Sequence, residues 1–210
     1  LPQQAAGVRP SRALPYVLAA DATVSARGVR LDFINDGSAG AVFHVYDQRH
    51  LRELPRRYTV EAGKALDDLW TPLATDFGAY DLWLLGPNGF HRQIAGRLGL
   101  LDGRAADPEV QARHDAASGE LRLVLINRGA SPCRFVIAEN AYREGPPRRI
   151  DVAANGRTTL RLDLRDSGRW YDVSVTLDGD RATDQAFVRR LAGRVETGAP
   201  SISDPAMGGT

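Results

Sequence analysis

Residues 30–37 read RLDFINDG, and a closely similar stretch occurs a second time in the chain. This repetition is the strongest indication of the fold. About 92 positions later the chain reads RLVLINRG, at residues 122–129. Three further pairs of segments recur in the same order, and they are 55–60 with 147–152 (PRRYTV, PRRIDV), 80–82 with 171–173 (YDL, YDV) and 95–97 with 192–194 (AGR in both). A chance origin for so many ordered matches is remote, so the sequence predicts two copies of one domain.

Each copy shows the alternation that is typical of β-strands. Val29, Leu31 and Phe33 are separated by polar residues, a period of two that indicates a strand with one buried face. Turn-forming stretches rich in Gly, Asn and Asp separate such runs. About seven short strands in roughly 90 residues predict an all-β fold of two tandem immunoglobulin-like β-sandwiches. A tyrosine corner is a further possibility at each Tyr-Asp pair, and a short helix is expected near residues 67–74.

The repeats predict the domain boundaries. We expect a linker at residues 1–14, sandwich repeat 1 at 15–101, a linker at 102–108, sandwich repeat 2 at 109–197, and a disordered tail at 198–210. The first ten residues have no signal-peptide pattern and look like a chain entered midway, so we expect a fragment of a longer protein.

Composition narrows the class of partner. The chain carries 27 basic and 26 acidic residues, a net charge of +1, which argues against a nucleic-acid partner. There is no apolar run of about 18 residues, so we expect no transmembrane segment. The single cysteine, Cys133, cannot form an internal disulfide and sits in an apolar strand pattern, which predicts a core position.

No pattern in the sequence predicts an active site. The four histidines lack the spacing of a zinc site, and no Gly-x-Ser-x-Gly turn presents a serine nucleophile. Asp178, Asp180 and Asp184 resemble a calcium loop only loosely, and a plain turn is the simpler interpretation, although calcium binding there stays open. We therefore predict no catalytic residue, no metal site and no cofactor in this chain.

Two surfaces are candidates for binding. Trp83 and Leu85 replace the Ser174 and Thr176 of the second copy and should point away from the core, so we predict a docking face for a catalytic domain. The alternative is that the two copies pack on each other there. The second surface is Phe90-His91-Arg92, where an aromatic residue and an arginine beside a turn could contact lipid.

With these motifs described, the chain resembles the C-terminal region of bacterial phosphocholine-specific phospholipases C, a group with haemolytic and non-haemolytic members. The matching stretches are 7–16 (GVRPSRALPY), 55–64 (PRRYTVEAGK), 86–90 (GPNGF) and 201–208 (SISDPAMG). The resemblance implies a secreted or periplasmic bacterial parent enzyme that hydrolyses phosphatidylcholine to phosphocholine and diacylglycerol. The family's catalytic positions have no counterpart here, so no catalytic residue is carried over.

The resemblance and the residues together leave three function classes. The leading one is a non-catalytic accessory module, which packs on the catalytic domain of the same polypeptide or aids contact with a phospholipid surface. The second is a stand-alone carbohydrate- or surface-binding adhesion module, since sandwiches are common scaffolds for such functions. The third, an enzyme in its own right, is disfavoured by the missing catalytic pattern.

Overall fold

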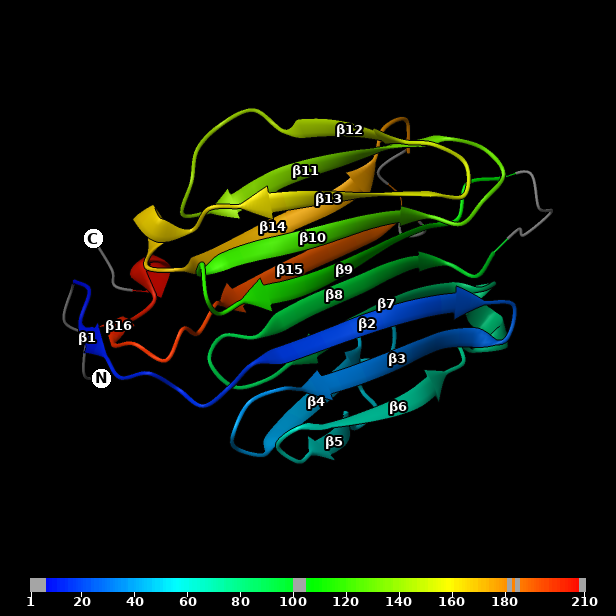
Figure 1. The fold of residues 1–210 in the computed structure, drawn as a ribbon. Coiled ribbons are helices and arrows are strands. Elements are labelled where there is room, and N and C mark those ends of the chain that lie inside the picture. Colours follow the sequence, from blue (N-terminus) through cyan, green and yellow to red (C-terminus); the bar gives the residue numbers. More distant parts are fainter. Residues whose placement is uncertain (1–6, 100–104, 181–182, 184–185, 208–210) are drawn as a thin grey trace.

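The two repeats form two β-sandwiches that share one sheet (Figure 1). The structure is a computed structural model, and it describes residues 7–99, 105–180, 183 and 186–207. Within each repeat a three-stranded sheet faces four strands of a continuous eight-stranded sheet. The prediction of an all-β chain with two tandem immunoglobulin-like sandwiches is therefore confirmed.

Repeat 1 contains β2 to β8, with the order β2-β3-β6 in one sheet and β8-β7-β4-β5 in the other. The expected helix near residues 67–74 is wrong, because β6 stays paired with β3 as far as Trp70 and only a 3-10 turn follows. The elements are β2 (Leu18–Ser25), β3 (Gly28–Asn35), β4 (Ala41–Asp47), β5 (Arg56–Val60), β6 (Lys64–Trp70), η1 (Ala74–Asp76), β7 (Ala79–Leu85) and β8 (His91–Arg97).

Repeat 2 contains β9 to β15 in the same arrangement, with the order β13-β10-β9 facing β12-β11-β14-β15. The elements are β9 (Pro108–Asp115), β10 (Glu120–Asn127), β11 (Cys133–Ala141), β12 (Arg148–Val152), β13 (Gly156–Leu162), η2 (Arg165–Ser167), β14 (Trp170–Leu177) and β15 (Val188–Arg194). The predicted linker at 102–108 lies partly outside the described residues, and β9 begins at its last position.

The repeated Ile-Asn-x-Gly stretch marks the end of the second strand in each repeat. Asn35 is fully buried, and its amide donates to the carbonyls of Ala39 and Val60, while its oxygen accepts the Gly37 N–H. A Cβ on Gly37 would lie 2.2 Å from the Pro15 carbonyl oxygen, so this position requires glycine. Asn127 makes the equivalent bonds in repeat 2, including one to the Gly129 N–H. The motif thus locks a turn against its neighbouring strands.

The repeats join edge to edge through β8 and β15. These strands pair antiparallel, with His91 opposite Ala192 and Ala95 opposite Val188. At the centre of this register Gln93 faces Arg190, its counterpart in the other repeat, and the pairs on either side are exchanged by a two-fold rotation, so an approximate two-fold axis passes through the pair. On the other layer β2 lies beside β9, where Asp21 accepts two hydrogen bonds from the Arg113 guanidinium. The junction therefore combines backbone pairing with an ion pair.

The chain ends are joined to each other. A two-residue strand, β1 (Pro10–Ser11), pairs with β16 (Ser201–Ile202), and a 3-10 turn, η3 (Pro205–Met207), follows. The prediction of a disordered tail at 198–210 is thus wrong for the described part, because backbone pairing with β1 and packing on repeat 2 order it. Residues 208–210 lie outside the described residues.

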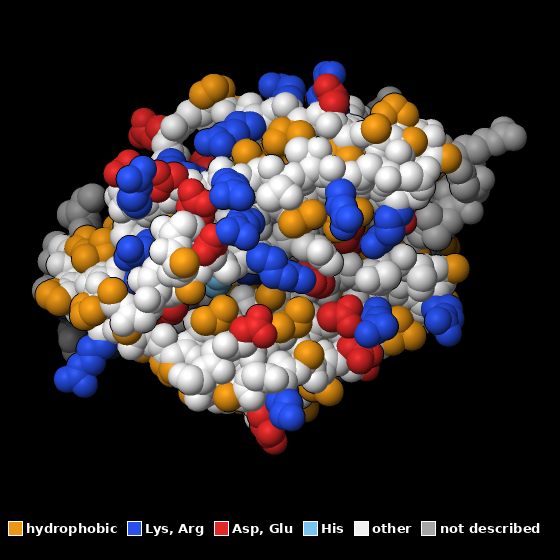
Figure 2. Space-filling model, in the orientation of Figure 1, with side chains coloured by type: hydrophobic (Ala, Val, Ile, Leu, Met, Phe, Trp, Pro, Cys, Tyr) orange, Lys and Arg blue, Asp and Glu red, His pale blue; other side chains and the backbone are white. Residues whose placement is uncertain are grey.

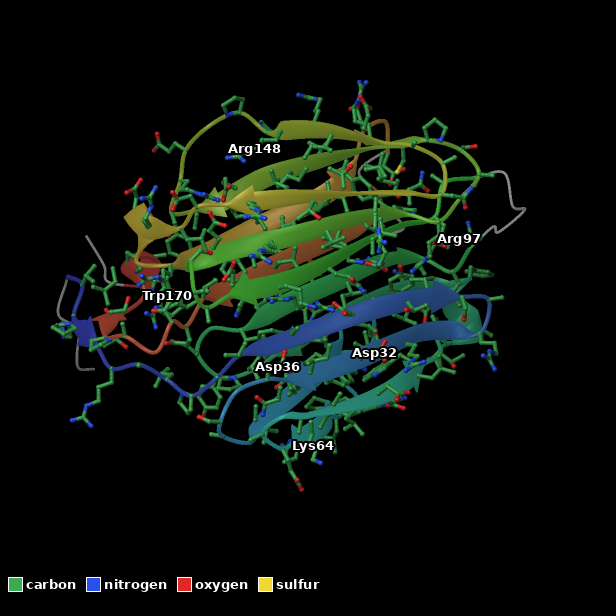
Figure 3. The ribbon with its side chains drawn as sticks, in the orientation of Figure 1. Asp32, Asp36, Lys64, Arg97, Arg148 and Trp170 are labelled. Carbon is green, nitrogen blue, oxygen red and sulfur yellow. The ribbon has the colours of Figure 1, made fainter. Side chains whose placement is uncertain are left out.

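The surface has no concentrated charge on the face seen in Figure 2. Basic and acidic side chains are interspersed over the two three-stranded sheets, where Arg30, for example, bonds Asp32 at 2.7 Å. The two edges of the molecule are marked in Figure 3 by Arg148, at the start of β12, and Lys64, at the start of β6. Among the described residues, no helix is long and apolar enough to cross a membrane.

Candidate functional site

Arg92 lies inside the junction of the repeats. Its side chain is 1 % exposed, and its guanidinium stacks 4.1 Å from the centre of the Phe90 ring. It donates hydrogen bonds across the junction to the Ala192 carbonyl at 2.8 Å and to the Tyr171 hydroxyl at 3.0 Å. Arg92 is therefore a structural contact between repeats.

The placement of Phe90 and Arg92 removes the premise of their predicted lipid contact. Phe90 is 4 % exposed and packs in the core of repeat 1, in a T-shaped contact with Phe43. Arg92 lies on the inward-facing side of β8 with the buried Ile94, and Phe90 directly precedes the strand. Neither side chain reaches the surface, so the lipid hypothesis at these residues is wrong.

Arg189 is the counterpart of Arg92 in repeat 2. It stacks 4.4 Å from the Phe187 ring centre and donates to the Ala95 carbonyl and to the Tyr80 hydroxyl of repeat 1. Each arginine thus reaches the tyrosine of the other repeat, reciprocally. The tyrosine-corner hypothesis is not supported, since the hydrogen bonds described for these hydroxyls are to side chains across or near the junction.

The two arginines differ in their counter-charge. Arg189 forms a bidentate ion pair with Glu109, with bonds of 2.7 and 2.9 Å, and both side chains are almost fully buried. Burial opposes the charge of Arg189, yet the Glu109 carboxylate raises its pKa. At the position of repeat 1 that corresponds to Glu109 stands Ala19, which pairs with Ile34 as Glu109 pairs with Ile126. Within the described residues no carboxylate pairs with Arg92.

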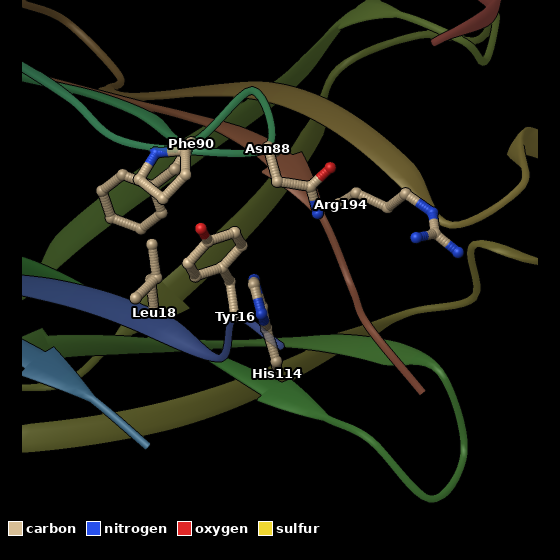
Figure 4. Close-up of a pocket in the computed structure, with 8 residues that line it drawn as sticks. Tyr16, Leu18, Asn88, Phe90, His114 and Arg194 are labelled. Atoms are coloured by element: carbon tan, nitrogen blue, oxygen red, sulfur yellow. The ribbon is translucent and has the colours of Figure 1, made fainter. Parts of the chain in front are cut away.

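A small cavity is lined by residues of both repeats, among them Tyr16, Phe90 and His114 (Figure 4). His114 Nε2 lies 2.8 Å from the Tyr171 hydroxyl, and burial together with the charges of Arg92 and Arg113 lowers the pKa of His114 to about 3. The histidine is therefore neutral, and the tyrosine proton can bond its Nε2. The volume is about 10 Å³, room for one water and too little for a substrate.

Among the described residues, the exposed large apolar side chains of the eight-stranded sheet lie on its outer surface, in repeat 1. Leu85 is 39 % exposed and Val42 40 % exposed, while Trp83 is half-buried between them and the junction. His44 pairs with Leu85 and Tyr46 pairs with Trp83 across β4 and β7, and all of them point away from the core. We call this surface the outer apolar face, and its residues are Val42, His44, Tyr46, Trp83, Leu85 and His91.

Trp83 carries a polar group without a partner. Its indole Nε1–H is buried and makes no hydrogen bond within the described part of the chain. The ring lies in a T-shaped contact with His91, with centroids 5.4 Å apart. Burial, then the charges of Arg190 and Arg92, lower the pKa of His91 to about 4, so the imidazole is neutral at physiological pH. The face is thus apolar and uncharged at its centre.

In repeat 2, the corresponding half of this sheet surface carries small and polar side chains. Ser174 and Thr176 stand where repeat 1 has Trp83 and Leu85, and the Asp172 carboxylate is held by Arg190 at 2.6 Å. The alternative that the repeats cover each other at Trp83 is wrong, because they join edge to edge and leave both outer surfaces on the same side of one sheet.

The remaining candidates form no chemical cluster. Among the described residues no three His, Cys, Asp or Glu side chains are placed to hold a metal ion. Asp178 is exposed and near Arg134, whereas Asp184 lies outside the described residues, so the calcium hypothesis stays untested. Cys133 is half-buried, and burial raises its thiol pKa, as expected for a packing residue.

Sequence reasoning missed the buried ion pair. A signal was present, since Phe90-x-Arg92 recurs as Phe187-x-Arg189 at the same offset as the Ala-Gly-Arg triplets. Nothing in the sequence indicated that Glu109 would meet Arg189, because β9 and β15 lie in different sheets.

Comparison with known proteins places the chain in a family. It is 42 % identical to a non-hemolytic phospholipase C of Pseudomonas aeruginosa and 43 % identical to one of Burkholderia pseudomallei, over 99 % and 98 % of its length. It is 37 % identical to a hemolytic phospholipase C of Pseudomonas aeruginosa over 99 % of its length. The chain spans only about 30 % of the length of these relatives.

A family model gives the same division as the structure. The model of the bacterial phospholipase C C-terminal domain matches residues 10–97 and again residues 108–194, one match to each sandwich. The matched region is the non-catalytic part of these enzymes. The chain belongs to the family of bacterial phospholipase C C-terminal domains and contains two copies of that domain.

Proposed function

We propose that this chain is the accessory module of a secreted phospholipase C that hydrolyses phosphatidylcholine to phosphocholine and diacylglycerol. The relatives carry the name phospholipase C, and the chain corresponds to their C-terminal region. In this proposal the module does no chemistry, and it packs through the outer apolar face on the catalytic domain of the same polypeptide.

The observation that carries the docking proposal is the asymmetry of the shared sheet. Trp83 and Leu85 stand on the same surface as Ser174 and Thr176, one repeat away, so the fold itself does not demand large apolar residues there. Aromatic side chains are enriched at the centres of protein interfaces, which favours this half of the surface as a docking face.

The test is isothermal titration of this chain against the separately expressed catalytic domain. We expect association at about micromolar Kd or tighter, and a loss of at least about tenfold for Leu85→Ser and for Trp83→Ser, which introduces the residue of repeat 2. Thr176→Ala, at the corresponding place in repeat 2, is the matched control and should bind normally. Equal affinity of all four proteins would refute docking at this face.

Failure to associate has a defined meaning. An adhesion module should bind an immobilised glycan without any catalytic partner, so glycan binding together with no association would favour that alternative. Phosphodiester hydrolysis by the purified chain would overturn the accessory assignment itself.

A further inference from the structure

A second exposed apolar cluster lies at one end of repeat 1, away from the outer apolar face. Two loops, residues 48–55 and 71–78, carry large side chains that point into solvent. Leu54 is 92 % exposed and Phe77 76 % exposed, and neither is needed to fill the core. We call this cluster the apolar tip, and its residues are Leu51, Leu54, Leu73 and Phe77.

The Asp76 carboxylate holds the two loops together. It accepts hydrogen bonds from Arg49 Nε at 3.1 Å and from the Leu73 N–H at 3.1 Å, and it lies 2.9 Å from His50 Nε2. Leu51 follows His50 directly, and Phe77 follows Asp76 directly. The exposed side chains are therefore presented by a preorganised base, and holding them in place costs little further entropy on binding.

In repeat 2, the residue that corresponds to Leu73 is buried and the one that corresponds to Phe77 is a glycine. Leu164 corresponds to Leu73 and is 1 % exposed, whereas Leu73 is 49 % exposed. Gly168 corresponds to Phe77, and a Cβ added there would lie 2.4 Å from the Ile202 side chain of the C-terminal tail. The same fold thus needs neither an exposed leucine nor a phenylalanine at this end, and in repeat 1 nothing in the described residues covers them.

Phe77 also occupies a conformation that suits glycine better. Its φ is 52°, in the left-handed region, and the equivalent Gly168 has a φ of 62°. A phenylalanine that is both strained and exposed weakens the fold rather than stabilising it. An outlier of this kind indicates a role in binding.

The chemistry of the apolar tip favours a lipid surface over a protein. Three of its four residues are leucine, which is under-represented among protein hot spots but typical of side chains that enter the headgroup and acyl boundary. The charged residues of the 48–55 loop are mixed in sign, with Arg52 beside Glu53 and Arg49 paired with Asp76. A tip without surplus charge is complementary to a zwitterionic surface.

We infer that the apolar tip inserts into the phospholipid surface and is the lipid-contacting element of the module. This inference rests on the proposed function, since a phospholipase meets its substrate in a bilayer. Leu51, Leu54 and Phe77 enter the interface, while the outer apolar face stays free to hold the catalytic domain. The lipid contact therefore lies at the apolar tip and does not involve the buried Phe90 and Arg92.

The experiment is cosedimentation of the 210-residue chain with vesicles of pure phosphatidylcholine. We expect wild type to partition, Phe77→Gly to lower the partition coefficient at least about tenfold, and a Leu51→Ser, Leu54→Ser, Phe77→Gly variant to abolish it. Phe77→Gly introduces the residue of repeat 2 and should leave the chain folded, which circular dichroism checks. Val42→Ser is the control, because Val42 is 40 % exposed on the outer apolar face, and its partitioning should equal wild type.

The outcomes separate this inference from the docking proposal. Raising NaCl from about 0.1 M to about 1 M should not release the protein, since the insertion is apolar. No partitioning of wild type, equal partitioning of the triple variant, or release by salt overturns the inference. Loss of catalytic-domain binding by the triple variant would reassign the tip to a protein interface. Leu85→Ser should lose binding to the catalytic domain and keep lipid partitioning. The docking proposal and the lipid inference can therefore be tested separately.

Discussion

Replacing Glu109 by glutamine should remove one charge of a buried ion pair and leave its shape almost unchanged. The Glu109 carboxylate is 1 % exposed and accepts two hydrogen bonds from Arg189, which is 3 % exposed. Losing one partner of such a pair leaves a buried charge uncompensated and costs about 3–5 kcal/mol in general. Native stability is about 5–15 kcal/mol for a typical domain, so the change is a large share of it.

The structure itself indicates the lower end of that range. Arg189 would keep its bonds to the Ala95 and Val188 carbonyls and its stacking on Phe187. Arg92 is equally buried with partners of this kind and no carboxylate. We therefore expect the free energy of unfolding to fall by about 3 kcal/mol.

Urea unfolding followed by tryptophan fluorescence and circular dichroism measures this difference. Glu120→Gln is the control, because Glu120 lies 3.9 Å from the exposed Arg161, and removing that surface pair should change stability by less than about 1 kcal/mol. A loss below about 1 kcal/mol for Glu109→Gln would contradict this expectation, since it would mean that carbonyls and an aromatic ring stabilise Arg189 as well as a carboxylate does.

Four further substitutions test other parts of the fold. Asn35→Ala should lower the free energy of unfolding by about 3 kcal/mol in a urea titration, because it leaves buried backbone groups of a turn unpaired. Asn127→Ala should do the same in repeat 2. A change below about 1 kcal/mol in both variants would contradict this role of the asparagines. Phe77→Gly should raise stability by about 0.5–1 kcal/mol by relieving a left-handed conformation, and a lower melting temperature would argue against strain there. The hydrogen bond to Asp76 raises the pKa of His50. The stability that this pair contributes should therefore be fully present below the pKa of the unfolded histidine and decline as pH rises through the folded pKa. His50→Ala should flatten the dependence of the unfolding free energy on pH between about pH 5 and pH 8. In the acid range burial of Asp76 opposes ionisation, but the bonds from His50 and Arg49 lower its pKa, and its contribution should be lost as pH falls through that value.

Much of the architecture could be predicted because the deciding signals are local. Alternation around Leu31 and Leu123 specifies which strand face is buried, since successive side chains point to opposite sides of a sheet. The Ile-Asn-x-Gly repeat reports a turn whose asparagine and glycine act within a few residues of each other. Because the domain is duplicated, the alternation and the Ile-Asn-x-Gly motif each occur twice in the sequence.

The candidate surfaces were predicted only in part. Alternation correctly placed Trp83 and Leu85 on the outside of their strand. The same alternation, applied to Phe90, Arg92 and Ile94, would have placed Arg92 in the interior, yet its charge and the nearby turn suggested an exposed tip. The burial of an arginine depends on partners supplied by another repeat, and those partners are not visible in a local pattern.

The amino-acid sequence is enough to specify the two repeats, the strands and the polarity of each strand face, because these follow from backbone geometry and the transfer of apolar side chains from water. Three features are visible only in the folded chain: the repeats share one sheet through β8 and β15, Glu109 contacts Arg189, and Asp76 holds together the two loops of the apolar tip. Such contacts join residues far apart in the chain, and their free energy depends on burial and partners that exist only once both sandwiches have formed.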